Sequence, residues 1–339
     1  MNGKTRFALI VMAVVAAVAI IWYRGQVYSK PNHDVHPRLV LLTGGDGPYW
    51  QLMAAGARDA ARNTDAEIEL IMPDGDEDLT RQTQMLSKID CNGIDGVALS
   101  PLAADKQTRL INSLCDRLIV VTVDSDAPLS NRTSYIGANN FAAGGQCGDA
   151  VRQAIPDGGK VVVCLANLTK DNMLERKRGL EAAVASDSGT ADGPTYEVVD
   201  WLVDNGDRAT ARDQLTEFLK QHPDIECVVG LNAFHGGEMI AAVADVGADC
   251  KIVAFDTEDA TLEGVASGGI FATVAQDPYQ YGSAAVRQLA YLCRNDEDGR
   301  PPLGVQSTLT IGTKVLRQED IERFRETFQS QETEPASSP

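Results

Sequence analysis

The most constraining feature of the sequence is an alternation of short apolar runs with longer amphipathic stretches, which begins near residue 38. Runs such as RLVLLT at 38–43 and GVALS at 96–100 alternate with stretches of helical periodicity such as 49–62 and 105–114. Short runs rich in Val, Ile and Leu that are separated by helices are typical of a parallel sheet covered on both faces. The sequence therefore predicts an α/β fold.

The alternation then begins again, and the second half corresponds to the first. GVALSPLAADKQTRLINSL, which starts at residue 96, matches CVVGLNAFHGGEMIAAVADVG, which starts at residue 227. LIVVTVDSDAP likewise matches KIVAFDTEDA. A chain of 339 residues is also longer than one hydrophobic core usually organises. We therefore expect two similar lobes, each with a doubly wound parallel sheet, rather than one large sheet.

Acidic residues follow two apolar strands at corresponding places in the two halves. VVTVDSDAPLS runs from a strand into Asp124 and Asp126, and KIVAFDTEDA delivers Asp256 and Glu258 in the same way. Ligands of open parallel sheets bind outside the carboxyl ends of the strands, so two facing lobes would form a cleft there. The loop from 167 to 176 would reach the same cleft. The candidate ligand-binding residues all lie just past a predicted strand: Tyr49, Trp50, Asp124, Ser125, Arg176, Asn232, Asp256 and Gln276.

These residue types suit a neutral ligand rich in hydroxyl groups. Each carboxylate can accept two O–H bonds while Arg176 donates to ring oxygens, and a hydrogen bond to a charged group contributes about 1.5–3 kcal/mol. Tyr49 and Trp50 would offer flat faces to the C–H side of a sugar ring. Local structural roles for the same residues remain an open alternative. An acid that follows a strand commonly caps the next helix, and Asn232 could do the same. Arg176 would then be a solvated helix charge, and the aromatic pair would be core.

Charge and motifs argue against several other classes of function. The formal net charge of −18 disfavours nucleic acid and anionic lipid as partners. TGGDGPYW at 43–50 lacks the spacing of both glycine-rich phosphate-binding motifs, and the four histidines have no metal-ligand spacing. No G-x-S-x-G elbow occurs. The sequence therefore predicts a binding protein without cofactor or metal, not an enzyme.

The first 26 residues predict export. Lys4 and Arg6 precede an uncharged run at 7–23, whose length is at the short edge of the ~17–25 residues of a bilayer span. The rest of the chain would then be periplasmic or otherwise extracytoplasmic. No A-x-A cleavage site follows the run, so an inner-membrane anchor is slightly favoured over a cleaved signal, and both stay open. Residues 27–36 would form a tether, and the polar, Pro/Ser-rich segment 326–339 a disordered tail.

An exported chain could oxidise its seven cysteines. Cys91 and Cys115 each precede an apolar strand of the first half, and Cys227 and Cys250 do so in the second half. We consider these two pairs candidate disulfides; that all seven stay reduced is the alternative. The other three are expected to be buried thiols: Cys147, Cys164 and Cys293.

A set of short segments, taken in order, resembles the periplasmic sugar-binding proteins of the ribose and galactose type. These segments are GPYW, IDGVALSP, VVTVDSDAP, YIGANNFAAG, ERKRGLEAA, VVGLNA, IVAFD and TVAQDPYQYG, and the resemblance covers roughly residues 37–316. It implies that a sugar hydrogen-bonds to Asp124, Arg176, Asn232, Asp256 and Gln276 and packs against Tyr49 and Trp50. Ser125 departs from the ribose-type pattern, so the identity of the sugar stays open.

The resemblance also implies a lobe arrangement and a role. The chain would cross between lobes near Ala138, Asp277 and Val305, giving lobes of 37–138 with 277–305 and of 139–276 with 306–325. Closure about this three-strand hinge would trap a monosaccharide. The expected role is that of a monomeric substrate-binding component of an ABC-type importer, whose partner is a permease in the membrane. The alternative is a membrane-tethered sensor that presents its closed form to a signalling receptor.

Overall fold

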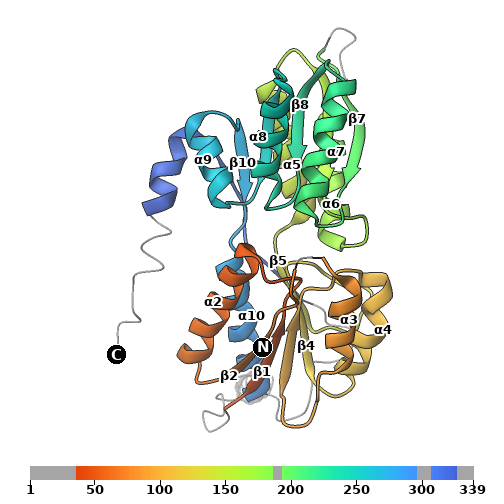
Figure 1. Ribbon diagram of the computed structural model, residues 1–339. Coiled ribbons are helices and arrows are strands. Elements are labelled where there is room, and N and C mark those ends of the chain that lie inside the picture. The colour runs from red at the N-terminus through yellow and green to blue at the C-terminus, as the bar shows by residue number, and fades with distance from the viewer. Residues whose placement is uncertain (1–35, 76, 186–192, 296–306, 327–339) are drawn as a thin grey trace, which may run out of the picture.

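The computed structural model describes residues 36–75, 77–185, 193–295 and 307–326, which form two lobes stacked one above the other (Figure 1). The predicted leader at 1–26 and the tether, apart from His36, lie outside the described residues. The same holds for the predicted tail, apart from Glu326. Among the described residues, no helix combines the length and the apolar character needed to cross a bilayer.

The first lobe contains a six-stranded sheet whose strand order is β11-β5-β4-β3-β1-β2. Every neighbouring pair in it is parallel. Its strands are β1 (Arg38–Leu42), β2 (Glu67–Ile71), β3 (Gly96–Leu99), β4 (Ile119–Val123), β5 (Ser134–Gly137) and β11 (Ser307–Thr310).

The second lobe contains a sheet of the same size with the equivalent order, β12-β10-β9-β8-β6-β7. Its pairs are parallel except β10 with β12, which is antiparallel. The matching orders confirm the predicted two-lobed α/β architecture. The strands are β6 (Gly159–Leu165), β7 (Tyr196–Val203), β8 (Ile225–Gly230), β9 (Lys251–Phe255), β10 (Ala272–Ala275) and β12 (Lys314–Leu316).

Helices cover both faces of each sheet, which explains why the inner strands such as β3 and β4 are buried along their whole length. In β1, Leu39 and Leu41 pack with α2 and α10, whereas Val40 and Leu42 pack with α3 and α4. In the second lobe, α5 and α6 cover one face, and α7, α8 and α9 the other. The helices are α2 (Pro48–Asn63), α3 (Leu79–Ser87), α4 (Ala104–Cys115), α5 (Asn140–Ala154), α6 (Asp171–Ala185), α7 (Arg208–Gln221), α8 (His235–Val246), α9 (Asp259–Ser267) and α10 (Pro278–Arg294), followed by the 3₁₀ turn η1 (Gln318–Asp320).

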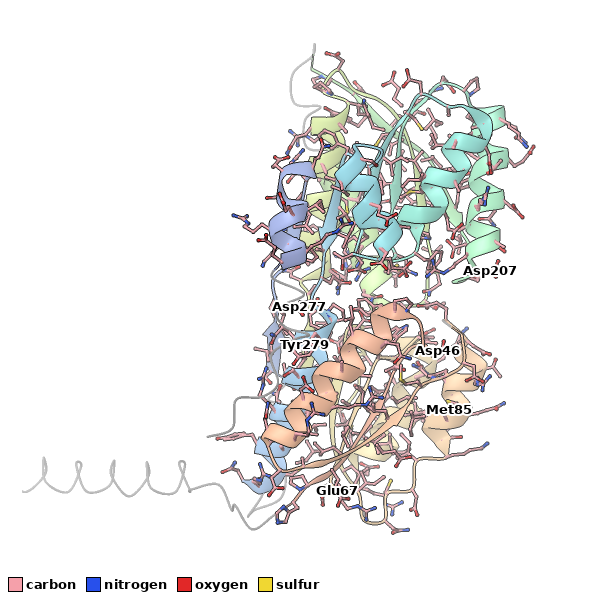
Figure 2. All side chains as sticks on the ribbon, turned by 60° about the vertical axis from the view of Figure 1, so that its left-hand side comes forward. Asp46, Glu67, Met85, Asp207, Asp277 and Tyr279 are labelled. Atoms are coloured by element: carbon pink, nitrogen blue, oxygen red, sulfur yellow. The ribbon has the colours of Figure 1, made fainter. Side chains whose placement is uncertain are left out.

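The chain crosses between the lobes three times. The first crossing joins β5 to α5, and the second joins β10 to α10 where Asp277 lies between the lobes (Figure 2). The third joins β11 to β12, so it lies between Thr310 and Lys314. The prediction that 306–325 belongs to the second lobe is wrong for β11, which pairs with β5 in the first sheet. The apolar signal fails there because all four residues of β11 are exposed.

The two candidate disulfides are absent, because all seven cysteines remain thiols. Cys227 is paired in register with Lys251, so Cys250 lies one position away and packs on the opposite face of the sheet. The Cys91 thiol donates to the carbonyl of Ile89 instead of bonding to Cys115. Burial raises the pKa of Cys147 to about 12, which keeps this thiol protonated.

Candidate ligand site between the lobes

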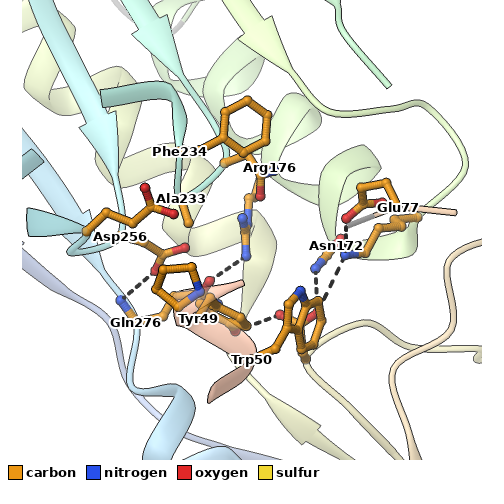
Figure 3. A pocket seen from close by; sticks show the side chains of 14 residues that line it. Tyr49, Trp50, Glu77, Asn172, Arg176, Ala233, Phe234, Asp256 and Gln276 are labelled. Atoms are coloured by element: carbon orange, nitrogen blue, oxygen red, sulfur yellow. Dashed lines mark hydrogen bonds and ion pairs between the residues drawn. The ribbon is translucent and has the colours of Figure 1, made fainter. Parts of the chain in front are cut away.

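A cavity lies between the lobes, where the carboxyl ends of both sheets meet (Figure 3). It has about 430 Å³ of space between its side chains, open mouth included. Seven of the eight predicted site residues line it, and Ser125 does not. The lining consists of Pro48, Tyr49, Trp50, Glu77, Asp124, Lys170, Asn172, Arg176, Asn232, Ala233, Phe234, Asp256, Glu258 and Gln276.

Asp124 and Asp256 occupy equivalent positions after β4 and β9 and share one backbone geometry. Their φ angles are 65° and 61°, in the left-handed region that non-glycine residues rarely adopt. The backbone N–H of Asp124 donates to Ile136 at 2.9 Å, and that of Asp256 donates to Val274 at 2.8 Å. Backbone strain of this kind gathers at functional sites. Neither acid is the N-cap of a helix, which argues against the capping alternative.

The Asp124 carboxylate is already supplied with donors from both lobes. Tyr49 donates its hydroxyl to Oδ1 at 2.8 Å, and Ser100 donates to Oδ2 at 2.9 Å. From the second lobe, Asn172 donates to Oδ2 at 3.3 Å, and Lys170 Nζ lies 3.7 Å from the same oxygen. Asn172 Oδ1, by contrast, is buried without a hydrogen-bond partner. The cavity therefore has an unused acceptor beside a well-supported acid.

Asp256 has a much poorer supply of donors. Among the described residues it accepts a single side-chain hydrogen bond, from the backbone N–H of Gln276 at 3.2 Å. Burial raises the pKa of Asp256 to about 7, although the nearby Arg176 charge acts to lower it. A buried carboxylate with unused lone pairs is costly without further donors. Asp256 is thus the lining acid that gains most from a ligand rich in O–H groups.

Arg176 is held rigidly rather than solvated, since it is 2% exposed. Its Nε donates to Asn140 at 3.0 Å, and its two terminal nitrogens donate to the Leu231 carbonyl at 2.9 Å and to Gln276 at 2.8 Å. The guanidinium carbon also lies 4.0 Å from the ring centroid of Phe255. Since a guanidinium has five N–H donors, two remain for a ligand.

A close helix crossing positions Arg176. A Cβ added to Gly144 of α5 would lie 2.0 Å from the backbone oxygen of Arg176 in α6, so only glycine permits this approach. Gln276, at the second crossing, is fixed in turn because its Nε2 donates to the Tyr281 hydroxyl at 3.0 Å.

The loop after β8 is fixed by a buried histidine. The backbone N–H of Asn232 donates to His235 Nδ1 at 3.1 Å, which leaves Nε2 as the protonated nitrogen, 2.9 Å from Asp204 Oδ2. His235 and Asp204 are both buried. The N-cap of α8 is Phe234, without a side-chain cap bond, so Asn232 does not cap this helix. Its side chain lines the cavity instead.

Tyr49 and Trp50 lie in the first turn of α2, and their rings contact edge to face with centroids 5.1 Å apart. Both line the cavity. Ser125 does not, because its backbone N–H turns back to the Val123 carbonyl at 2.8 Å and its side chain is buried. Asp126 forms an ion pair with Arg132 and does not line the cavity.

Comparison with known proteins identifies the family. A family model described as a periplasmic binding protein domain matches residues 39–297. The chain belongs to this family. The ribose import binding protein of Haemophilus influenzae is 24% identical over 273 residues, which cover 80% of this chain and 88% of that protein.

Solved structures of this family resemble the present one. GanP, a glucose-galactose binding protein from Geobacillus stearothermophilus, has 29% identity and a TM-score of 0.76, with 84% of this chain and 99% of that chain covered. XylFII, in its complex with LytSN, has 25% identity and a TM-score of 0.72, with the same two coverages.

Sequence reasoning missed several lining residues of this periplasmic binding protein. Lys170 and Asn172 lie in the loop expected at the cleft, but no role was predicted for either. Phe234 follows a predicted strand-tip residue by two positions, a signal that was available. Glu77 lies six residues after β2 within a polar segment, where nothing in the sequence marks it. Glu258 was noted beside Asp256 at the strand tip but was not predicted to bind the ligand, and the remaining missed residues are Pro48 and Ala233.

Proposed function

We propose that the interlobe cavity binds a monosaccharide. The observation that carries the proposal is the convergence of two equivalent strand-tip acids, Asp124 and Asp256, with the rigid Arg176 in one cavity. The other lining acids are already paired: Glu77 with Lys170 and Glu258 with Arg208. A ligand therefore needs hydroxyl groups rather than a compensating charge. The names of the ribose- and glucose-galactose-binding relatives support the same class.

The lining suggests how one sugar ring would bind. Hydroxyl groups would donate to Asp256 and to the unpartnered Asn172 Oδ1, and the remaining Arg176 N–H groups would donate to sugar oxygens. Asn232 and Gln276 would add amide hydrogen bonds. Tyr49, Trp50 and Phe234 would contact the apolar face of the ring. We expect a micromolar dissociation constant, which corresponds to about −8 kcal/mol.

The proposed role is that of an extracytoplasmic binding protein, not an enzyme, which hands the sugar to an ABC-type permease. It would act as a monomer, with residues 7–23 as leader or anchor. Closure about the three crossings would present one defined surface to the permease.

The test is isothermal titration calorimetry of the purified protein against a panel of pentoses and hexoses. We expect saturable binding of at least one sugar with a stoichiometry of one, and no heat from sugar phosphates, since the lining acids repel them. Asp207 lies outside the cavity, so Asp207→Asn is a suitable control variant that should bind like the wild type. Absence of heat with every sugar of the panel would contradict the proposal.

A sensor role is the second candidate, and one observation favours it. XylFII is similar in fold along nearly its whole length and forms a complex with LytSN. A membrane anchor at 7–23 would suit such a role. Neighbouring genes would distinguish the two: a permease and an ATPase favour import, whereas a histidine kinase favours sensing.

A further inference from the structure

Contacts between the lobes gather on one short loop of the second lobe, which links β6 to α6. Asn167 Nδ2 donates to Glu77 Oε2 at 2.6 Å, and Lys170 Nζ lies 2.9 Å from Glu77 Oε1. Thr169 donates its hydroxyl to the Leu102 carbonyl at 3.0 Å. We call this group of five residues the clasp. Its Glu77 lies at the opposite end of the cavity from Asp256 and Gln276 (Figure 3).

Both halves of the clasp are preorganised within their own lobes. Asn167 Oδ1 accepts from the backbone N–H groups of Thr169 and Lys170, at 3.0 and 2.8 Å. Glu77 has a left-handed φ of 64°, and its backbone N–H donates to Gly44 at 3.2 Å. Contacts within each lobe therefore orient the groups that meet across the lobes.

The charges of the clasp are removed from water. The side chains of Lys170 and Glu77 are 4% and 5% exposed. Burial acts to lower the pKa of Lys170, but the charges of Glu77 and Asp124 together with the hydrogen bond to Glu77 raise this pKa overall, so the residue is a cation. Removing one member of a buried ion pair leaves an uncompensated charge, which costs more than removing both. Separation of the lobes is the simplest way to hydrate such a charge.

We propose that Glu77 and Lys170 hold the lobes closed through this ion pair and thereby help to set the affinity of the cavity. The pair joins two side chains of the protein itself, so it favours the closed state with or without a bound ligand. Lys170 also couples the clasp to the site, since its Nζ lies 3.7 Å from Asp124 and 5.3 Å from the Trp50 ring centroid. The affinity part of this proposal rests on the proposed function, whereas the closure part does not.

The closure part is tested by small-angle X-ray scattering of the sugar-free protein. Glu77→Gln and Lys170→Met should each increase the radius of gyration relative to the wild type. The double variant E77Q/K170M should lie between the wild type and the single variants, because it removes both members of the Glu77–Lys170 pair. Lys160→Met is the matched control: it removes a 2.6 Å pair with Asp224 that is exposed and lies within the second lobe, so scattering should not change.

The affinity part of the proposal is tested by calorimetry with the sugar of the panel that binds most tightly. Each single variant should weaken binding by about tenfold or more, and the double variant by less. Wild-type scattering and wild-type affinity in both single variants would overturn the proposal, as would a double variant more open than either single one. If no sugar binds, the proposed function fails, and scattering still decides whether the clasp closes the lobes. If a single variant does not fold, the radius of gyration of E77Q/K170M, compared with that of the Lys160→Met control, decides whether the ion pair holds the lobes closed.

Discussion

Asp256 shows most clearly how a single residue can be placed for binding at the expense of stability. It is 5% exposed, and its carboxylate accepts one hydrogen bond among the described residues, whereas the carboxylate of its counterpart Asp124 has donors from three side chains. The two acids share their backbone geometry, so the difference lies in the side chains around them. The poorly supplied acid is where a ligand would contribute most.

The raised pKa of Asp256 predicts a pH-dependent cost. The pKa is about 7 in the folded protein against an ordinary value of 3.8, so the folded state binds more protons than the unfolded state between these values. Stability contributed by this group therefore falls as the pH rises from about 4 to about 7 and is constant above that.

Asp256→Asn should remove this cost. Since asparagine tolerates a left-handed φ, the variant should be more stable than the wild type by roughly 2–4 kcal/mol above pH 7, and the difference should vanish below about pH 4. Denaturant unfolding across this pH range measures the difference in unfolding free energy between the variant and the wild type. A variant that is equally stable or less stable at pH 8 would show that the carboxylate is better accommodated than its surroundings suggest.

At the scale of elements, the paired helices α5 and α6 determine where Arg176 lies. Gly144→Ala should push α6 away, because its Cβ would meet the Arg176 backbone oxygen. We expect a loss of about 1–3 kcal/mol in unfolding free energy, together with weaker sugar binding.

Gly145→Ala, at the next position of the same helix, is the control. The atom nearest to the added Cβ would be 3.9 Å away, so the substitution should leave the unfolding free energy unchanged or raise it by about 0.5–1 kcal/mol. Thermal unfolding and calorimetry compare the two variants. Equal effects at both positions would mean that the close crossing does not constrain Arg176.

The same scale shows what the sequence could reveal. β4 and β9 were predictable because their residues are mostly apolar. Asp124 and Asp256 follow these strands directly, which allowed both strand ends to be assigned to one cleft. β11 escaped because it is an exposed edge strand without an apolar pattern. The prediction of a Cys227–Cys250 disulfide failed because the register of β8 and β9 sends these two residues to opposite faces. Periodicity predicts elements, but register depends on pairing.

At the scale of the whole molecule, contacts between lobes were the least predictable feature. Glu77 and Lys170 are 93 positions apart, and neither belongs to a periodic pattern. Their pairing depends on how the two lobes meet after each has folded. The internal repeat predicted two lobes and a cleft, whereas the residues that join the lobes lie outside the repeated segments.

The central claim is that the two strand-tip acids and Arg176 meet around one sugar ring. The most direct measurement is a crystal structure of the protein with the sugar that binds best in the calorimetric panel. We predict a single ring between the lobes, with hydroxyl groups within hydrogen-bond distance of Asp256 and Asn172 and a sugar oxygen near Arg176. A sugar bound outside this cavity, or inside it without contact to Asp256, would contradict the account.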